Sequence, residues 1–390
     1  MSNVVYLIDR SRVETREACP RKRFLNYDFA GTGLEPEEQS LPLLSGIAMH
    51  TAFARLLAGQ DLEDVLRDIL LAYRQEIEAR GLQNLDVTED IIQQQSALLE
   101  GMLRLWHRVR MPAILRDYEV ISIEQAWRWE LAPGLYQSFR FDVLLRRRDD
   151  GVIFIMDFKT VKYPSEVWFE KFEHNLQTCL YLQAVKERMA QLTGNADDIL
   201  GGILYEGLVK GAFKKDTAQK SPWFGQRLQQ SPYTIAYKLD GDQGVCVYQS
   251  DYTSKKGYRK VKTFEEMPMK NWVDHLFYNE QSVVNELFIV VPDICPPAYE
   301  LERVKAQVIR EELQYHKQLD TYREMDPTGR YAEDYLDLFA PLRTNQCYQY
   351  GADHKCPFLS VCFNRGAAPL EDGGFIPRKP HHDTDLVMVA

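Results

Sequence analysis

The chain has 390 residues, of which 45% are hydrophobic and 27% charged, so it can bury one large core or two modest ones. No apolar run approaches the roughly 18 residues that a membrane-spanning helix needs. Residues 1–10 lack the pattern of a signal peptide, so we expect a cytoplasmic protein without a membrane partner. The net charge of −10 does not exclude nucleic acid, because net charge describes the whole surface and not one cleft.

Helical patterns dominate the first third of the chain. Residues 11–27 suit a short helix, and a loop rich in Gly, Pro and Glu follows at residues 31–39. From Leu44 to about Arg110, apolar residues recur at the spacing of helices. Proline removes a hydrogen bond from a helix, so Pro112 is predicted to end this region.

The pattern then changes to the alternation and apolar runs typical of strands. Strands are predicted at residues 119–131, 137–146, 152–159 and 201–209, and a helix is predicted at residues 175–192. Asp149-Asp150-Gly151 is a strong hairpin signal between the second and third of these strands. This order predicts an α/β fold in which a mixed sheet is flanked by helices.

The second half of the chain is less regular. Prolines interrupt residues 211–265, where residues 233–239 suit a strand, and helices return at residues 271–290 and 298–323. The chain is predicted to have six parts. They are an N-terminal segment (1–35), a helical region (36–118), a core (119–210), an insertion with C-terminal helices (211–345), a cysteine segment (346–365) and a flexible tail (366–390). We find no internal repeat.

An acid and a lysine end the most apolar of the predicted strands. Alternate residues of a strand share a face, so Asp157 and Lys159 point the same way, and the hairpin brings Asp142 alongside. Buried charges are costly unless paired or bound to metal, and two close carboxylates favour a divalent cation such as Mg²⁺ or Mn²⁺. Such an ion can polarise a phosphodiester and activate a water that Lys159 would orient or help deprotonate. A salt bridge on an ordinary hairpin is the alternative.

Three further polar residues could face the same cleft. Gln177 and Tyr181 lie four residues apart on the predicted helix and therefore share a face, although a surface pair or a partly buried tyrosine would give the same pattern. His50, near the start of the first long helix, could supply a nitrogen ligand to the metal, although a lone histidine is usually structural. Each feature is weak by itself.

Taken in order, these residues resemble the RecB-like branch of the PD-(D/E)XK nucleases. This branch includes RecB and AddB nuclease domains, CRISPR-associated RecB-like nucleases, and phage or prophage members. The motifs that carry the resemblance are Gly46-x-x-x-His50, Asp142, Asp157-x-Lys159-Thr160 and Gln177-x-x-x-Tyr181. Their order and spacing together are specific, and they match over residues 10–210. The resemblance implies a restriction-endonuclease-like fold with large helical insertions.

The resemblance also implies a role for each matching residue. The metal ligands would be His50, Asp142, Asp157 and the main-chain carbonyl of Phe158. Lys159 would be catalytic, and Gln177 and Tyr181 would position the DNA strand or the active-site groups. Glu124 would be an acid outside the first set of ligands. The expected activity is metal-dependent hydrolysis of DNA, as an exonuclease on single strands or DNA ends.

The seven cysteines are unevenly placed, and their odd number without a secretion signal argues against a disulfide framework. Cys19 lies in the stretch Cys19-Pro20-Arg21-Lys22-Arg23-Phe24, and Cys347, Cys356 and Cys362 crowd near the other end. Four thiolates suit a 4Fe-4S cluster, and zinc, with His354 nearby, is the alternative. The remaining cysteines, expected to be inert and partly buried, are Cys179, Cys246 and Cys295.

The resemblance favours iron over zinc. In the iron–sulfur members of this branch, one cysteine precedes the core in a Cys-Pro-basic-basic-aromatic stretch and three follow it. Eight residues separate Cys347 from Cys356, whereas many relatives space these two closely, so the ligand geometry stays open. The cluster would join the two ends of the chain as a staple, and its binding free energy would become folding free energy.

Basic and aromatic residues are candidate DNA contacts. The basic candidates are Arg21, Lys22, Arg23, Lys214 and Lys215, although solvated faces have the same composition. The aromatic candidates for base stacking, which could equally be core residues, are Tyr205, Phe213, Trp223 and Tyr258.

The resemblance further implies a helicase or recombination partner and work in recombination, repair, replication or CRISPR-type processing. One alternative is a non-catalytic DNA-binding or assembly module that keeps the fold and the cluster. The intact Asp157-Phe158-Lys159 argues against that alternative. The other alternative is a zinc-binding structural protein in which the charged hairpin is incidental.

Overall fold

The computed structural model describes most of the chain, and every structural statement below concerns that part. It comprises residues 6–38, 40–80, 87–162, 168, 170–215, 225, 227–230, 235–240, 243–252, 260–267, 269–327, 336–337, 339–348, 355–363, 374–378 and 387–388. The predictions made for Trp223, Tyr258, His354 and the side chain of Cys246 lie outside it. Within the described part, no helix combines the length and apolar character that crossing a bilayer requires.

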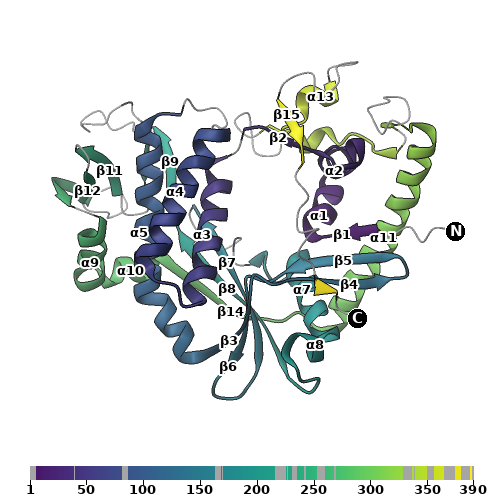
Figure 1. Cartoon of the computed structure of the whole chain (residues 1–390), viewed down its shortest axis with the longest axis horizontal. Coiled ribbons are helices and arrows are strands. Elements are labelled where there is room, and N and C mark those ends of the chain that lie inside the picture. The colour runs from purple at the N-terminus through teal and green to yellow at the C-terminus, as the bar shows by residue number, and fades with distance from the viewer. Residues whose placement is uncertain are drawn as a thin grey trace.

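A mixed five-stranded sheet lies at the centre of the molecule (Figure 1). Its strands, in spatial order, are β14 (Phe288–Ile294), β8 (Leu200–Val209), β7 (Ile153–Val161), β6 (Val143–Arg147) and β3 (Tyr118–Ile123). β7 and β8 are parallel, and the other neighbours are antiparallel. Residues 153–158 are all buried, as expected for a strand with helices on both faces. The predicted α/β fold, a mixed sheet flanked by helices, is confirmed.

A second sheet has four strands, and the chain enters it after β3 and returns to the central sheet at β6. Its strands, in spatial order, are β1 (Tyr6–Ile8), β5 (Leu135–Arg140), β4 (Ala126–Ala132) and β16 (Val387–Met388). The strand predicted at residues 119–131 is therefore β3 and β4, and the strand predicted at 137–146 is β5 and β6. The first change of sheet occurs at Glu124, whose φ of 48° is uncommon for a residue other than glycine. The second occurs at Asp142.

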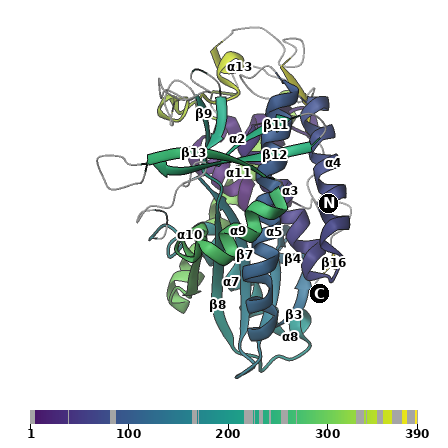
Figure 2. The same cartoon turned by 90° about the vertical axis from the view of Figure 1, so that its left-hand side faces the viewer.

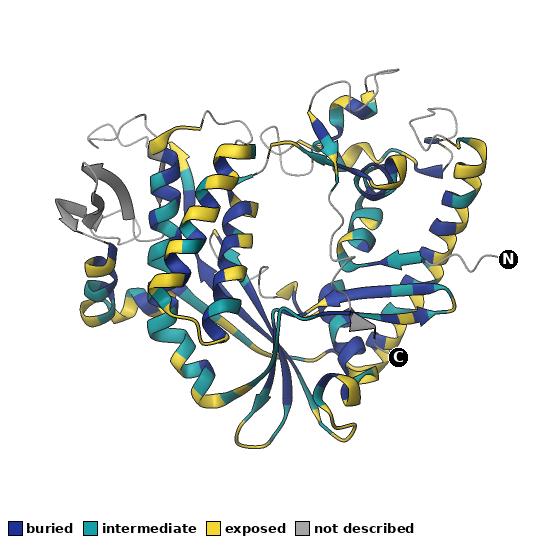
Figure 3. Cartoon of the chain, viewed as in Figure 1, coloured by how far each residue is buried: buried dark blue, intermediate teal, exposed yellow. Residues whose placement is uncertain are grey.

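Three helices cover one face of the central sheet and expose their outer sides (Figure 3). They are α3 (Leu41–Leu57), α4 (Leu62–Arg80) and α5 (Glu89–Asp117). The ring of Phe158 packs against Phe53 and Trp106, with centroids 4.6 Å and 5.7 Å away. Pro112 lies inside α5 and does not end it, contrary to the prediction. The lost hydrogen bond is tolerated because Ile114, just beyond the proline, is buried in the same core.

The opposite face of the central sheet is covered by helices that follow β7 in the chain. They are α7 (Leu176–Glu187), α8 (Met189–Thr193) and α11 (Ala298–Met325). The helix predicted at 175–192 is therefore two helices, and the one predicted at 298–323 is confirmed as α11. The helix predicted at 271–290 is divided into α9 (Met269–Asn279), α10 (Gln281–Leu287) and the start of β14. That strand is an edge strand, half-exposed, so its composition does not separate it from the helix before it.

The two ends of the chain pack together on α11 (Figure 1). Their elements are α1 (Arg10–Ala18), α2 (Pro20–Tyr27), η1 (Phe29–Gly31), β2 (Leu34–Pro36), η2 (Thr344–Gln346), α13 (Leu359–Phe363) and β15 (Phe375–Pro377). The single helix predicted at residues 11–27 breaks at Cys19, because Pro20 begins a new helix. The segment predicted to be a flexible tail contributes β15, which pairs with β2, and β16, which pairs with β4.

Two small sheets lie beside α5 (Figure 2). One pairs β9 (Ala212–Lys215) with β10 (Arg227–Gln230), and the other contains β11 (Ile235–Asp240), β12 (Gln243–Tyr252) and β13 (Lys260–Met267). The strand predicted at residues 233–239 corresponds to β11. The other four strands were not predicted from the sequence.

Candidate metal centre and cysteine site

The acids of the candidate site lie where the chain changes sheets. Asp142 follows β5 and Glu124 follows β3, and the N–H of Glu124 donates to the main-chain oxygen of Asp142 (2.9 Å). The N–H of Phe158, in the buried strand β7, donates to Asp142 Oδ2 (2.7 Å). The Asp142 carboxylate is therefore fixed against β7 by a charge-assisted hydrogen bond.

Helix α3 places His50 against these two acids. Its Nδ1 lies 3.2 Å from Asp142 Oδ2 and 3.9 Å from Glu124 Oε1. One ligand atom from each of the three residues lies within 4.8 Å of the others, and within the described part this is the group that meets that spacing. Ligand bonds of about 2 Å to a small cation require such a spacing. The nitrogen and carboxylate donors therefore fit a divalent metal ion.

Asp157 and Lys159 share a face of β7 beside this group. Asp157 is only 2% exposed. Its Oδ1 accepts from Gln177 Nε2 (2.6 Å), and its Oδ2 is paired with Lys159 Nζ. Lys159 Nζ also donates to Gln177 Oε1 (3.3 Å). These contacts offset the cost of burying the carboxylate and fix its orientation.

The charged groups of the site shift one another's pKa values. Burial raises the pKa of Asp157, and the Lys159 ammonium opposes this only in part. Burial, together with the Asp142 charge, raises the pKa of Glu124 to about 7. Burial would also raise the pKa of Asp142, but His50 and the neighbouring ammonium hold it below its usual value. Carboxylates crowded in this way favour a divalent cation, which would replace the protons they otherwise take up.

Helix α7 supplies the predicted glutamine and tyrosine. Asn175 caps the helix by accepting from the N–H of Gln177 (2.8 Å), which fixes its first turn. Gln177 also binds the Asp157 carboxylate through its amide nitrogen. The Tyr181 hydroxyl donates to the main-chain oxygen of Arg140 (3.0 Å) at the end of β5. Burial raises the pKa of Tyr181, so this hydroxyl keeps its proton at neutral pH.

The structure brings together five residues predicted for the site, namely His50, Asp142, Asp157, Lys159 and Gln177. Glu124, predicted to lie outside the first set of ligands, belongs to the group of converging ligand atoms with His50 and Asp142. Arg10 was not predicted, yet its Nη1 donates to Gln177 Oε1 (2.5 Å). No sequence signal pointed to it, because an arginine before a helical pattern is common.

Four cysteines that are distant in the sequence line one cavity. They are Cys19, at the junction of α1 and α2, and Cys347, Cys356 and Cys362 from the C-terminal segment. The N–H of Cys356 donates to the main-chain oxygen of Cys347 (2.9 Å). Burial raises the pKa of Cys362 to about 12, and the other three thiols add to this shift. A cation bound among them would stabilise the thiolates, so the lining fits a metal or a metal cluster.

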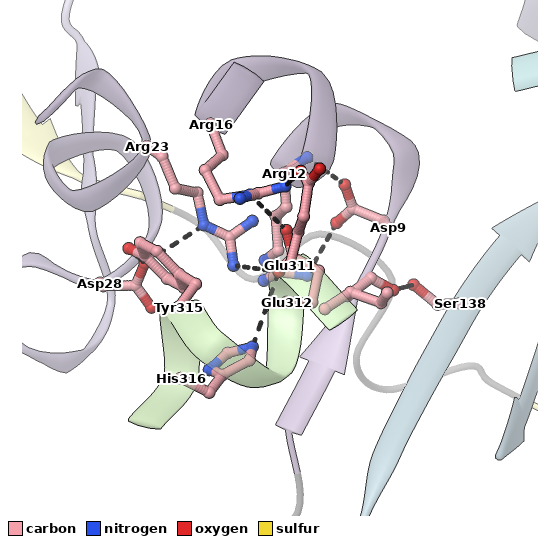
Figure 4. Close-up of polar contacts among 11 residues, drawn as sticks. Asp9, Arg12, Arg16, Arg23, Asp28, Ser138, Glu311, Glu312, Tyr315 and His316 are labelled. Carbon is pink, nitrogen blue, oxygen red and sulfur yellow. Dashed lines mark hydrogen bonds and ion pairs between the residues drawn. The ribbon is translucent and has the colours of Figure 1, made fainter. Parts of the chain in front are cut away.

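The arginines beside Cys19 are interior and do not form a DNA surface. Arg21 is 2% exposed and is paired with Asp337. Arg23 is 1% exposed and lies 3.3 Å from Asp28 and 3.8 Å from Glu312 (Figure 4). The predicted DNA contacts of these two arginines are therefore wrong, because α11 and the C-terminal segment cover the guanidinium groups.

The remaining candidate DNA contacts differ in their exposure. Lys214 and Lys215 are exposed at the end of β9, and Lys22 is half-buried at the cysteine cavity. Tyr205, predicted to stack on a base, is buried against Phe172 with ring centroids 3.9 Å apart. It is a core residue, which corrects that prediction.

A buried strand thus carries an acid and a lysine on one face, within a mixed sheet between two helical layers. The model of the PD-(D/E)XK nuclease superfamily matches residues 10–363, and the chain belongs to this superfamily. Its members typically use divalent metal ions. A search among curated proteins finds no match.

Proposed function

We propose that the protein is a Mg²⁺- or Mn²⁺-dependent deoxyribonuclease of the RecB-like branch. The observation that carries the proposal is that Asp142, Asp157 and Lys159 gather with His50 around one end of a buried strand. A non-catalytic DNA-binding module would not need an acid and a lysine at this position, where their burial is costly.

The residues of the site can have different roles in the reaction. His50, Glu124 and Asp142, whose ligand atoms converge, would hold an ion together with the neighbouring Asp157. Such an ion would polarise the scissile phosphodiester and lower the pKa of a bound water. Lys159 is held on its acid partner and can donate to the phosphate oxygen on which negative charge grows.

The recessed position of the acids supports a substrate that is a single strand or a DNA end. Asp157 is 2% exposed, so a scissile phosphate has to enter the protein surface to reach it. A single strand or a frayed end enters such a site more readily than the middle of a duplex. Lys214 and Lys215 are exposed and could hold the phosphate backbone outside the site. An exonuclease is the activity that fits this access best.

We propose further that Cys19, Cys347, Cys356 and Cys362 hold a 4Fe-4S cluster. A single zinc ion, about 2.3 Å from each sulfur, would hold the sulfur atoms within about 4 Å of one another. Among the described cysteines, no three sulfur atoms approach one another within 4.8 Å, as the ligand atoms around His50 do. The wider spacing supports a cluster, whose own atoms lie between the thiolates.

Anaerobic purification followed by digestion of end-labelled DNA tests both proposals. We expect a brown protein with about four irons per chain, and cleavage of single-stranded DNA that requires Mg²⁺ or Mn²⁺. Asp157→Asn and Lys159→Ala should each slow cleavage at least about 100-fold. Asp150→Asn, on the exposed hairpin turn, is the matched control and should cleave normally.

Two outcomes would contradict the proposals separately. Cleavage that survives both Asp157→Asn and Lys159→Ala would exclude the proposed active site. Stoichiometric zinc in place of iron, in protein that was never exposed to air, would exclude the cluster and leave the nuclease proposal standing.

A further inference from the structure

Arg10 reaches the candidate active site from outside the central sheet. It is the first residue of α1, and its half-buried side chain extends to α7. Its Nη1 donates to Gln177 Oε1 (2.5 Å), and its Nε donates to Glu14 Oε1 (2.9 Å) on the next turn of α1. The guanidinium is thus held at one end by its own helix and makes its other contact with the residue that binds Asp157.

The start of α1 is built to keep this side chain in place. Asp9 caps the helix by accepting from the N–H of Arg12 (2.8 Å), and the Arg12 guanidinium pairs with the same carboxylate (2.7 Å). Val13, one turn after the cap, is fully buried in the core that also contains α7. A capped and buried helix fixes the backbone from which the Arg10 side chain extends, so only the side-chain torsions remain to be ordered when the contact forms.

Arg10 helps to fix which way the side-chain amide of Gln177 is turned. An amide has an accepting oxygen and a donating nitrogen, and the two are nearly the same size. Gln177 Oε1 faces two cationic donors, Arg10 and Lys159, whereas Nε2 faces the Asp157 carboxylate. Rotating the amide by half a turn would place its NH₂ against two cations and its oxygen against a carboxylate.

Of the two cations, Arg10 makes the shorter contact with the amide oxygen. The distance from Arg10 Nη1 is 2.5 Å and the distance from Lys159 Nζ is 3.3 Å. Lys159 is also paired with Asp157, and its proposed role at the reacting phosphate would draw it from the amide during a turnover. The guanidinium of Arg10 instead divides its hydrogen bonds between the amide and Glu14, so its hold on the amide can persist throughout the reaction.

We infer that Arg10 is a positioning residue of the nuclease, which fixes the amide of Gln177 so that Nε2 holds Asp157 in the orientation needed for metal binding and catalysis. The inference rests on the proposed nuclease function. Groups that orient the ligands of a metal site typically affect activity or metal affinity by 10- to 100-fold when they are removed. The N-terminal helix therefore completes an active site whose other residues come from α3, the central sheet and α7.

A double-mutant cycle tests whether Arg10 acts through Gln177. The four proteins are wild type, Arg10→Ala, Gln177→Ala and the double variant, each assayed for steady-state cleavage of single-stranded DNA and, by calorimetry, for binding of Mn²⁺ alone. We expect Arg10→Ala to lower kcat about 10-fold or more with KM within about 2-fold, and to weaken Mn²⁺ binding. The double variant should be no slower than Gln177→Ala, because both changes remove the same interaction.

Two controls separate positioning from folding and from general charge. Arg67→Gln removes an equivalent charge from the exposed face of α4 and should leave kcat unchanged. Arg10→Lys keeps a cation that can donate to the amide but cannot span to Glu14 in the same way, and it should retain more activity than Arg10→Ala. A thermal unfolding midpoint close to that of wild type shows that the Arg10 variants are folded.

The inference fails if the effects of Arg10→Ala and Gln177→Ala multiply in the double variant. It fails equally if Arg10→Ala raises KM and flattens its dependence on salt while kcat is kept, since that is the signature of a phosphate contact. A wild-type protein without nuclease activity would instead contradict the proposed function. The Mn²⁺ titration would still report, in that case, whether Arg10 supports metal binding.

Discussion

His316 is a buried histidine at the junction between α11 and the N-terminal segment (Figure 4). Its ring stacks on Tyr6, with centroids 4.2 Å apart, and its Nε2 lies 3.8 Å from Glu312 Oε2, too far for a hydrogen bond. Burial, together with the nearby Arg23 guanidinium, lowers the pKa of His316 to about 4. His316 therefore stays neutral in the folded protein as the pH falls below about 6.5, where the same residue is protonated in the unfolded chain.

We predict that His316 makes the protein less stable as the pH falls from about 6.5 to about 4. In this window the unfolded chain binds a proton at this residue and the folded protein does not. The free energy of unfolding should fall by up to about 3 kcal/mol, with no change from this residue above or below the window. His316→Phe keeps an aromatic ring on Tyr6 and should remove the effect.

Denaturant unfolding of both proteins between pH 4 and pH 7.5 measures the difference. Glu312, whose pKa burial raises, contributes to both proteins and largely cancels in the comparison. A difference in stability that stays constant across this range would show that His316 accepts its proton freely in the folded state.

The residues of the candidate site differ in how far the sequence could predict them. Asp157 and Lys159 were accessible because a strand places alternate residues on one face, and a hairpin signal brought Asp142 beside them. Glu124 was undervalued because its position depends on a left-handed backbone conformation that composition does not reveal. Arg10 depends on packing between α1 and α7, which no local pattern encodes.

At the scale of elements, the turn at Gly33 determines how β2 returns along α2. Gly33 has a φ of +80°, and a Cβ added there would lie 2.1 Å from the main-chain oxygen of Asn26. The N–H of Gly33 donates to the main-chain oxygen of Phe29 (2.8 Å). Only glycine allows this close approach, so the pairing of β2 with β15 depends on it.

We predict that Gly33→Ala lowers the free energy of unfolding by more than about 1 kcal/mol. Gly31→Ala is the matched control, because Gly31 has a similar φ of +83° but no atom within 4 Å of an added Cβ. Both variants bear the conformational strain of alanine at positive φ, and only Gly33→Ala adds the steric clash. Thermal unfolding of the two variants compares them, and equal losses would mean that the turn yields to the methyl group.

Element types were predictable from periodicity, whereas several boundaries were not. The helices of residues 41–117 and α11 follow from apolar spacing, and β7 follows from its apolar run. The helix was predicted to end at Pro112, but α5 continues beyond it because buried contacts there outweigh one lost hydrogen bond. The divisions at Glu124 and Asp142 were missed because strand alternation continues across a change of sheet.

At the scale of the whole molecule, the cysteine cavity joins parts of the chain that are more than three hundred residues apart. Under the proposed cluster, Cys19→Ala and Cys347→Ala should each lose iron absorbance and lower the free energy of unfolding by about 2–5 kcal/mol, the range for loss of a native cross-link. The double variant should be little worse than either single variant, because one missing ligand already disrupts the cluster.

Cys295→Ala is the control for this comparison. Cys295 is exposed, rather than partly buried as predicted, and does not line the cavity. Iron content and thermal unfolding of the variants supply the measurements. Full iron in Cys19→Ala would show that the N-terminal cysteine is not a ligand.

Helix α1 has one end beside Gln177 of the candidate active site and the other at the cysteines. A ribosome synthesises this helix long before its partners on α11 and in residues 344–363. The nascent chain can thus form its sheet while Arg10 still lacks the packing that holds it. Translation order alone would delay the final assembly of the candidate active site until residues 344–363 have been made.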